Sequence, residues 1–516
     1  MTRPLEAIVV GGGIAGMAFA IRLTEFAAGR PLRVRIISKA PVQVSSSYVA
    51  QGGMAAVIAS DDRLEQHVQD TLGVGCGRND EAVVRAVVGE GPDMVRWLQG
   101  LGAAFDTDAG GALRLAREGG HSAARVVHFK DSTGAEIVRV LRERMIHLPQ
   151  VEVLENCRAL DLIMKDDEAG RQCCGVRVLD IPAAREMELH ADVVVLATGG
   201  AGQVYAHTTN PPAATGDGIA MAVRAAIALR DMAFVQFHPT ALYTDGQGQD
   251  FLVSEAVRGA GARLLGADRR PLMEGRHPKG DLAPRNVVAR TIHHEMMRTG
   301  SPHVWLDAAP IGSVRFAAEF PSIDRRCRAL GLVPGVDLIP VLPAAHYLCG
   351  GIRTDVRGRT SAEGLIALGE CAGTGLHGAD RLASNSLLEA LVVPRWAAEE
   401  VWETTLRVPG PPVDVARPAA MAKRVSAVGE RIAVFLRHAM SAHVGIVREE
   451  EGLGIALRSI AWADRHLAPI REKRRYSAEL LDLKDMLAVA RAITEAAIRE
   501  PLSVGAHYVE ERAALV

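Results

Sequence analysis

The sequence predicts an α/β protein: a nucleotide-binding parallel sheet, interrupted by an insertion and followed by a helical region. Three observations support this prediction. A short apolar run leads into closely spaced glycines near the N-terminus. Two later apolar runs that end in glycine, at 191–200 and 364–373, have the character of buried parallel strands. Past about Pro418 the pattern changes to amphipathic helices.

The glycine-rich stretch from Ala7 to Gly16 reads as a strand, a tight turn and a helix. Gly11, Gly13 and Gly16 have the G-x-G-x-x-G spacing that is typical of dinucleotide sites. The first glycine permits the turn, the second lets a diphosphate approach the backbone, and the third lets the helix pack on the strand. A pyrophosphate is expected at the helix N-terminus, where unpaired N–H groups point outward. An isolated motif of this kind also occurs in turns that bind nothing.

The next apolar strand, Val34 to Ile37, completes a β-α-β unit at the expected distance and strengthens the dinucleotide interpretation. This strand ends in Ser38 and Lys39, where an ordinary NAD site has an acidic residue that binds the ribose. A run of small and hydroxyl residues follows, from 41 to 56, and leaves room for a bulky ring system. The sequence therefore predicts a dinucleotide site that is not an ordinary NAD site.

Composition limits the remaining possibilities. A chain of 516 residues should hold two to four domains. Its 59 basic and 61 acidic residues nearly balance, which argues against nucleic-acid or membrane-surface binding. No stretch is long and apolar enough to span a bilayer. The seven cysteines include no C-x-x-C pair, so we expect a reduced, cytoplasmic protein with no iron-sulfur cluster and no structural metal.

Residues 61–88 are predicted to be helical with interruptions, and a further helix is predicted at 93–101. Strands of a small antiparallel insertion are predicted at 151–164 and 175–179. Asp217 stands at the start of a helix, where it could meet cofactor hydroxyls, cap the helix, or do both. The basic residues between 471 and 475 are expected to form a solvated connection between helices.

Polar residues concentrate in an insertion of roughly a hundred residues between sheet segments. They include His238, the pair Ser254 and Glu255, arginines in the segment 284–290, and His346. Zinc binding is one use for the histidines, but neither has a ligand partner at helical spacing. Arginine forks and histidine donors suit the recognition of carboxylates better.

The last glycine-ended strand carries Glu370, which can accept hydrogen bonds from ribose or ribityl hydroxyls. The segment 378–389 then enters a helix, whose N-terminus near Ser384 to Leu387 offers a positive dipole end. A reduced, anionic flavin is stabilised by this positive helix end, whereas a nicotinamide ring has the opposite electrostatic requirement. This contrast selects FAD.

At this point the motifs resemble those of the succinate dehydrogenase and fumarate reductase flavoprotein superfamily, over nearly the whole chain. The matching segments are 11–16, 48–53, 208–218, 236–240, 254–259, 285–290, 346–351 and 378–389. Within the superfamily the chain most resembles the branch that oxidises L-aspartate. Respiratory relatives have a histidine that binds FAD covalently where this chain has Ser46, so noncovalent FAD is expected. They also tend to read Phe-Gly-Gly where this chain has Glu118-Gly-Gly, and a carboxylate there could pair with the ammonium group of aspartate.

The resemblance implies an α/β FAD-binding Rossmann-like domain with an inserted α+β capping domain and a C-terminal helical domain. The implied boundaries are 1–232 and 348–416 for the FAD-binding domain, 233–347 for the capping domain and 417–516 for the helical domain. Two departures from the family pattern, Ala260 and Val504, remove no expected catalytic residue. Val504 lies outside the expected pocket and bears on domain docking or a partner surface.

The resemblance also implies the site residues. Those expected to hold FAD are Gly11, Gly13, Ile14, Ala15, Gly16, Lys39, Ser46, Ser47, Tyr48, Ala50, Gln51, Gly52, Gly53, Asp217, Glu370, Ser386 and Leu387. Those expected to bind substrate carboxylates or the ammonium group are Glu118, His238, Ser254, Glu255, His346 and Arg381. Arg290 is expected at the position of the proton-transfer residue, and His238 and His346 beside it as catalytic groups. Because arginine is a poor base, fixing and polarising the substrate is the safer role for Arg290.

The implied reaction moves a hydride from the Cα of aspartate to flavin N5 and gives iminoaspartate, the first step of quinolinate and NAD synthesis. Oxygen or fumarate would reoxidise the flavin, and a direct transfer of iminoaspartate to quinolinate synthase is left open. The alternative enzyme is a soluble fumarate reductase or succinate dehydrogenase flavoprotein. A different class, a noncatalytic FAD-binding sensor, would show no turnover with any dicarboxylate.

Overall fold

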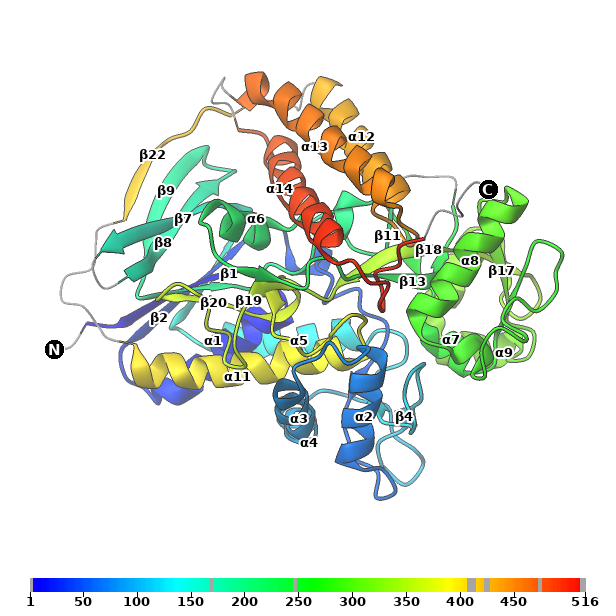
Figure 1. The fold of residues 1–516 in the computed structure, drawn as a ribbon. Helices are drawn as coiled ribbons and strands as arrows, with labels where there is room; N and C mark the ends of the chain where they lie inside the picture. The colour runs from blue at the N-terminus through cyan, green and yellow to red at the C-terminus, as the bar shows by residue number, and fades with distance from the viewer. Residues whose placement is uncertain are drawn as a thin grey trace.

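A five-stranded parallel sheet, in the order β20-β10-β1-β2-β6, forms the centre of the protein (Figure 1). The computed structural model describes residues 3–167, 170–244, 248–405, 414–421, 427–471 and 476–510, so the basic stretch 472–475 lies outside the described residues. The five strands are β1 (Leu5–Val10), β2 (Leu32–Ser38), β6 (Val151–Glu155), β10 (Val193–Leu196) and β20 (Leu365–Ala367). The run at 191–200 joins the first sheet, as predicted, and the run at 364–373 adds its next strand.

Strand β1 is buried on both faces, and its side chains alternate between two cores. Ala7 and Val9 pack with helices α1 (Ile14–Ala27) and α11 (Asn385–Thr404) on one face of the sheet. Ile8 and Val10 pack on the other face, against β7 (Cys157–Asp167), β8 (Gly170–Asp180) and helix α6 (Asp217–Arg224). This alternation follows from the two-residue period of a strand, and burial on both faces is typical of parallel sheets.

A second, antiparallel sheet in the order β22-β9-β8-β7 covers this second face (Figure 1). Its strands are β7 (Cys157–Asp167), β8 (Gly170–Asp180), β9 (Arg185–His190) and β22 (Val415–Pro418). The prediction of one antiparallel insertion from 151 onward was wrong in its first part. Residues 151–155 form β6 and pair in parallel with β2, because the chain turns only after Glu155.

The capping region has its own core, formed by residues between Leu242 and Val341. Its long strands β13 (Val235–Leu242) and β18 (Ile339–Leu348) pair antiparallel and reach back to the first domain. The shorter strands are β11 (His207–Thr208), β14 (Gly248–Gln249), β15 (Phe251–Leu252), β16 (Arg263–Leu265) and β17 (Val304–Asp307). The helices are α7 (Glu255–Gly259), α8 (Arg285–Thr299), α9 (Ser313–Glu319) and α10 (Pro321–Ala329).

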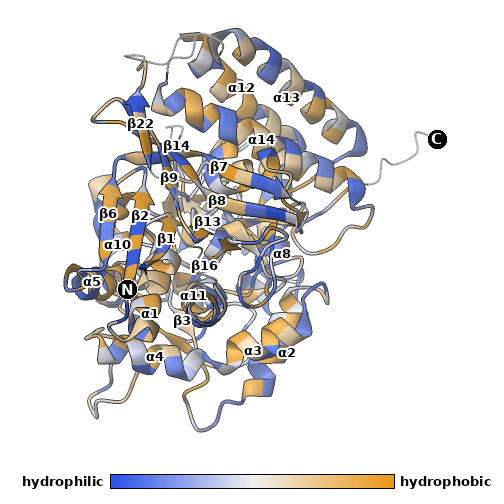
Figure 2. Ribbon diagram, turned by 90° about the vertical axis from the view of Figure 1, so that its left-hand side faces the viewer, coloured by the Kyte–Doolittle hydropathy of each residue, from blue (hydrophilic) through white to orange (hydrophobic). Residues whose placement is uncertain are grey.

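The C-terminal helices are α12 (Ala427–His443), α13 (Glu450–Arg471) and α14 (Ala478–Arg499). Figure 2 shows hydrophobic and hydrophilic residues interspersed along α12 and α13, as the amphipathic pattern predicts. Their buried residues do not form a separate core. They join the cluster on the β8 and α6 side of the parallel sheet, so α14 is part of the wall of the first domain.

Smaller elements complete the first domain. They are the helices α2 (Leu64–Val74), α3 (Glu81–Gly89), α4 (Gly91–Gly100) and α5 (Thr133–Ile146), and the strands β3 (Met54–Ala55), β4 (Leu115–Ala116), β5 (Val126–Val127), β12 (Leu229–Arg230), β19 (Gly351–Arg353) and β21 (Ala372–Gly373). Across the described ranges, no helix combines the length and the apolar character that crossing a membrane requires.

Candidate functional site

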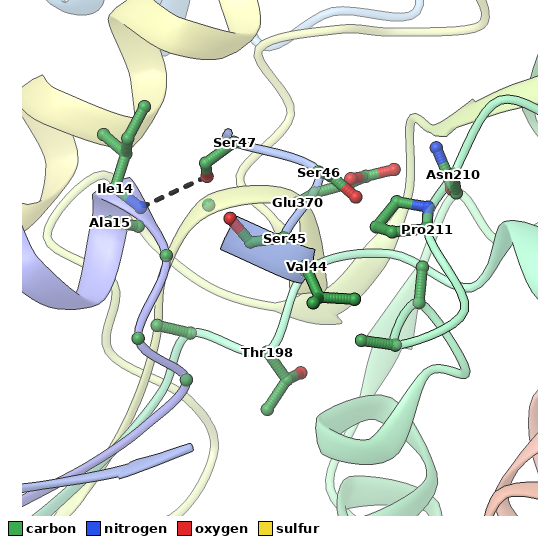
Figure 3. Close-up of a pocket in the computed structure, with 18 of the residues that line it drawn as sticks. Ile14, Ala15, Val44, Ser45, Ser46, Ser47, Thr198, Asn210, Pro211 and Glu370 are labelled. Atoms are coloured by element: carbon green, nitrogen blue, oxygen red, sulfur yellow. Dashed lines mark hydrogen bonds between the residues drawn. The ribbon is translucent and has the colours of Figure 1, made fainter. Parts of the chain in front are cut away.

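One large cavity lies at the carboxyl ends of the parallel strands, where ligands of such sheets bind. It encloses about 280 Å³, whereas a second cavity behind it encloses only about 10 Å³, too little for a ligand. Figure 3 shows its walls, which come from the glycine turn, the serine run at 45–47, Thr198, the loop at Asn210 and Pro211, and Glu370. Its lining runs from the glycine turn and Lys39 to His346 and Arg381, so the cavity joins the predicted pyrophosphate cradle to the capping region.

The glycine turn is packed too tightly to accept other residues. Gly11 has a φ of +116°, and a Cβ on it would lie 2.1 Å from the carbonyl oxygen of Ala197. A Cβ on Gly16 would lie 2.1 Å from the carbonyl oxygen of Gly11, so helix α1 can approach the strand only because Gly16 has none. The N–H of Ile14 donates to Ser47 Oγ at 3.2 Å (Figure 3). This cradle, with no acidic residue in the first helical turn, fits a pyrophosphate.

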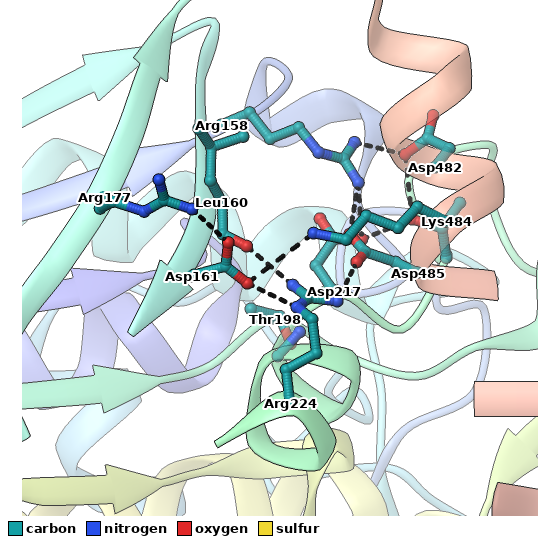
Figure 4. A network of polar contacts seen from close by, with 12 residues as sticks. Arg158, Leu160, Asp161, Arg177, Thr198, Asp217, Arg224, Asp482, Lys484 and Asp485 are labelled. Carbon is teal, nitrogen blue, oxygen red and sulfur yellow. Dashed lines mark hydrogen bonds and ion pairs between the residues drawn. The ribbon is translucent and has the colours of Figure 1, made fainter. Parts of the chain in front are cut away.

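Lys39 and Asp217 meet at one end of the cavity. Lys39 Nζ lies 2.9 Å from an Asp217 carboxylate oxygen and 3.1 Å from Asp482 of helix α14. Although burial disfavours its charge, Arg158 and Lys39 hold the pKa of Asp217 below its usual range. Figure 4 shows Asp217 in a network with Arg158, Asp482 and Asp485, which joins the cavity wall to α14.

The structure contradicts the capping role of Asp217. The N-cap of helix α6 is Gly216, and Asp217 is the first helical residue, with no capping bond from the N-cap side chain. The Asp217 carboxylate is instead held by Thr215, Lys39 and Arg158.

Glu370 reaches the cavity from the loop after β20. Its Oε1 accepts a hydrogen bond from the Leu348 N–H at 3.0 Å, and a Cβ on Gly200 would lie 2.2 Å from the same oxygen. Desolvation raises the pKa of Glu370 to about 7. An acceptor of this kind fits a sugar or ribityl hydroxyl, which would stabilise its ionised form.

Most of the residues expected to hold FAD line the cavity. They are Gly11, Gly13, Ile14, Ala15, Lys39, Ser46, Ser47, Ala50, Gln51, Asp217, Glu370, Ser386 and Leu387. Gly16 acts through packing, and Tyr48 lies outside the lining with a 38% exposed side chain. Gly52 and Gly53 lie beside Glu118 and Ser384: a Cβ on Gly52 would lie 3.1 Å from Glu118, and the Gly53 N–H donates to Ser384 Oγ.

The two predicted histidines come together from the paired strands β13 and β18. The ring centroids of His238 and His346 are 5.1 Å apart. The Thr240 N–H donates to Nδ1 of His238 at 3.2 Å, which leaves Nε2 as the nitrogen that carries the proton. Thr209 Oγ1 lies 2.7 Å from Nδ1 of His346. Burial and nearby arginines lower both pKa values well below the usual range, so the rings are neutral donors near pH 7.

Two arginines converge on Gln236, a residue that the sequence prediction missed. Arg285 NH1 donates to Gln236 Oε1 at 3.0 Å, and Arg381 NH2 donates to the same oxygen at 3.2 Å. The Gln236 amide nitrogen donates to Asp380 and to the Arg381 carbonyl. Gln236 lies two residues before His238 on one strand, and this period places both on the same face. The two-residue spacing between Gln236 and His238 was the feature of the sequence that could have identified Gln236.

Glu255 holds one of these arginines in place. Arg285 Nε donates to Glu255 Oε2 at 2.7 Å, and Arg258 lies 3.4 Å from Oε1. Burial disfavours the charge of Glu255, but Arg285 and Arg258 together lower its pKa, so this carboxylate is ionised. Ser254 caps helix α7 beside it, with Oγ accepting from the Ala256 N–H at 3.3 Å.

The structure places Arg290 elsewhere, which corrects the prediction. Its guanidinium stacks 4.3 Å from the ring centre of Tyr508 instead of joining the cluster. Arg285 and Arg290 are five positions apart on helix α8, which separates them by about 140° around the axis. Arg285 therefore faces the site, and Arg290 faces the C-terminal segment. Both lie in the same sequence motif, and only the helix orientation distinguishes them.

Glu118 lies at the far side of the cluster. It is 4% exposed, and Ser384 Oγ lies 2.6 Å from its Oε2. Burial, followed by the nearby Glu255, raises its pKa, while Arg285 and Arg381 oppose the shift. A buried carboxylate with only one short hydrogen bond suits a cationic partner. The structure thus brings Glu118, Glu255, His238, His346 and Arg381 into one cluster, and their binding of substrate stays a prediction.

Comparisons with known proteins agree with this arrangement. The FAD binding domain family matches residues 6–387, and the fumarate reductase flavoprotein C-terminal family matches 435–514. L-aspartate oxidase 1 of Ralstonia nicotianae is 41% identical over 98% of this chain and 94% of its own. L-aspartate oxidase of Arabidopsis thaliana is 37% identical over 99% of this chain and 81% of its own. The chain belongs to the L-aspartate oxidase family.

The predicted α/β fold with capping and helical domains is confirmed by this family's solved structural relatives. The chain resembles quinol fumarate reductase of E. coli with a TM-score of 0.87 and 28% identity, over 99% of this chain and 92% of that one. The FAD binding domain match spans both the large cavity and the capping region. FAD is therefore the cofactor that this L-aspartate oxidase fold implies.

Proposed function

We propose that the protein oxidises L-aspartate to iminoaspartate with noncovalently bound FAD, as the first step of quinolinate and NAD synthesis in the cytoplasm. Oxygen or fumarate would accept the electrons, and quinolinate synthase would receive the product. The family membership supports the reaction. The position of Glu118 supports the choice of an amino acid over succinate.

The charges around Glu118 explain why the site would prefer aspartate to succinate. Two arginines, Arg285 and Arg381, supply positive charge for two carboxylates. Burial and Glu255 raise the pKa of Glu118, and a bound ammonium group would favour the ionised form of this carboxyl. Succinate has no group that would offset the repulsion from Glu118, whereas the α-ammonium group of aspartate forms an ion pair with it. The site thus matches the charges of an amino dicarboxylate.

The residues of the chain then have separate tasks. Arg381 and Arg285 bind the carboxylates through charge-assisted hydrogen bonds, and the neutral rings of His238 and His346 add donors. Gln236 keeps the two guanidinium groups at a fixed separation. Glu118 holds the amino nitrogen, which must lose a proton as the C=N bond forms. When bound, FAD supplies the acceptor for the hydride that leaves Cα.

The lining of the cavity supports noncovalent FAD. The chain has a serine, Ser46, at the position where the respiratory relatives have a histidine, and Ser46 lines the cavity. A hydroxyl offers no ring nitrogen for a stable flavin link. Precipitating the protein with acid should release all yellow colour into the supernatant, and colour retained in the pellet would contradict this part of the proposal.

Anaerobic flavin reduction tests the proposed reaction. Purified protein is mixed with L-aspartate, and separately with succinate, while the flavin absorbance is followed. We expect bleaching with aspartate and none with succinate. Bleaching by succinate alone would move the protein to the fumarate reductase and succinate dehydrogenase branch. Bleaching by neither, nor by any other dicarboxylate, would support a noncatalytic FAD-binding sensor.

A further inference from the structure

The segment from Ser503 to Val509, here called the C-terminal strap, lies between the first domain and the capping region. Figure 1 shows it in red after α14, running toward the green capping elements. Asn286 of helix α8 donates to the Gly505 carbonyl at 2.8 Å. The Ala506 N–H donates to the Ala379 carbonyl at 2.9 Å. One short stretch of chain therefore bonds to both sides of the substrate site.

The strap is a closed turn and not a loose tail. Val504 and His507 exchange two backbone hydrogen bonds, of 2.7 and 3.0 Å. Ser503 Oγ bonds to both the N–H and the carbonyl of Val509, each at 2.9 Å. Gly505 has a φ of +56°, and a Cβ on it would lie 2.5 Å from the Ala379 carbonyl oxygen. The strap is thus seated in direct contact with the loop that carries Arg381.

Arg448 connects the strap to the segment that leads into strand β13 of the capping region. It is 1% exposed, and its NH1 donates to the carbonyl of Ala233, two residues before strand β13. The same NH1 lies 2.6 Å from Nδ1 of His507, and the Arg448 N–H donates to the Tyr508 carbonyl at 2.9 Å. Burial and the charge of Arg448 lower the pKa of His507 to about 4, so His507 is a neutral acceptor.

Helix α8 presents two residues to the strap. Asn286 and Arg290 are four positions apart, so they lie on the same face. Asn286 bonds to Gly505, and Arg290 stacks on Tyr508. Arg285 is adjacent to Asn286 but points to Gln236 and Glu255. Because one helix carries all three residues, a rotation of α8 that breaks the strap contacts also displaces Arg285 from its position beside Gln236.

We propose that the C-terminal strap holds the capping region in its closed position over the substrate site. Asn286, Arg290 and Tyr508 are positioning residues: they touch no reacting group but fix the separation of Arg285 and Arg381. The strap acts on substrate binding, and it leaves the pyrophosphate cradle at Gly11 to Gly16 unaffected. The effect on substrate rests on the proposed function, whereas the effect on capping-region opening does not.

Three variants test the strap. Tyr508→Ala removes the ring beneath Arg290, Asn286→Ala removes the bond to Gly505, and Tyr508→Phe keeps the ring as a matched control. Hydrogen-deuterium exchange is measured for the α8 peptide at 285–299 and, as a reference, for α1 at 14–27. FAD affinity, the unfolding temperature, and kcat and KM for L-aspartate are measured on the same FAD-loaded proteins.

Each of the two alanine variants should raise exchange in α8 and the KM for aspartate about fivefold. This change corresponds to the loss of one hydrogen bond in Asn286→Ala and of one cation–π contact in Tyr508→Ala. FAD affinity, α1 exchange and kcat should stay within about twofold, and Tyr508→Phe should match the parent. Parent-like α8 exchange in both alanine variants would overturn the proposal. Equal losses in FAD affinity and α1 protection would also overturn it, because the strap would then stabilise the whole fold. If the parent itself does not oxidise aspartate, the proposed function fails, but the exchange comparison still decides the role of the strap.

Discussion

Replacing Arg285 by leucine is the sharpest test of the substrate site, because Arg290 on the same helix is a matched control. The Arg285 side chain is 9% exposed and bonds to Glu255 at 2.7 Å and to Gln236 at 3.0 Å. Arg285→Leu removes a charged donor from the substrate and leaves the buried Glu255 with Arg258 as its remaining cation. Arg290→Leu removes only a stacking contact with Tyr508.

The two losses differ in size. Hydrogen bonds to charged groups contribute about 1.5–3 kcal/mol each, so a lost two-bond contact to a carboxylate should cost about 3–4 kcal/mol. At about 1.4 kcal/mol per tenfold change, kcat/KM for aspartate should fall roughly 100- to 1,000-fold in Arg285→Leu. A partly buried cation–π contact contributes about 0.5–1 kcal/mol, so Arg290→Leu should lose about fivefold or less, mainly in KM.

The assay is anaerobic reduction of the bound flavin by L-aspartate in stopped flow, with FAD content and unfolding temperature measured for each variant. Arg285→Leu should bind FAD as the parent does and yet be reduced at least about 100-fold more slowly at limiting aspartate. Equal effects of the two variants, or a larger loss in Arg290→Leu, would refute the assignment of Arg285 to the substrate site.

Three further predictions follow from single residues. Glu118→Gln should raise the KM for aspartate at least about tenfold, because the ion pair with the ammonium group is lost. Succinate, measured as a competitive inhibitor, should bind to this variant as well as to the parent or better. Weaker binding of both ligands would contradict the role of Glu118. Desolvation raises the pKa of Glu370 to about 7, and bound hydroxyl donors favour its ionised form, so FAD affinity in a fluorescence titration should fall about tenfold from pH 8 to pH 6. Glu370→Gln should flatten that profile, and an unchanged slope would assign it to another group. Asp482→Ala should lower the free energy of unfolding by about 1–3 kcal/mol and lower the unfolding temperature, because the buried Arg158 loses one of its acidic partners. Glu495 is an exposed acid on the same helix whose ion pair measures 4.0 Å, so Glu495→Ala should cost less than about 0.5 kcal/mol. Equal shifts of the unfolding temperature in the two variants would contradict the role of Asp482.

Features that depend only on residues close together in the chain could be predicted from the amino-acid sequence. The strand, turn and helix at Ala7 to Gly16 were predictable because glycine spacing and apolar runs act locally. The strands at 191–200 and 364–373 were predictable for the same reason, and both joined the first sheet. The histidines and arginines of the insertion pointed to carboxylate binding through their chemistry alone.

The tertiary structure decided which of these residues meet. Arg285 and Arg290 share one motif, and the orientation of α8 on its core brings only Arg285 to Gln236. The sequence of residues 151–155 would suit a strand of the antiparallel sheet or of the parallel sheet. In the structure these residues pair with β2, which places them in the parallel sheet. The C-terminal helices share the core of the first domain, since their apolar faces are buried only when packed against it. Such choices depend on contacts between segments that are distant in the chain, and local patterns do not encode them.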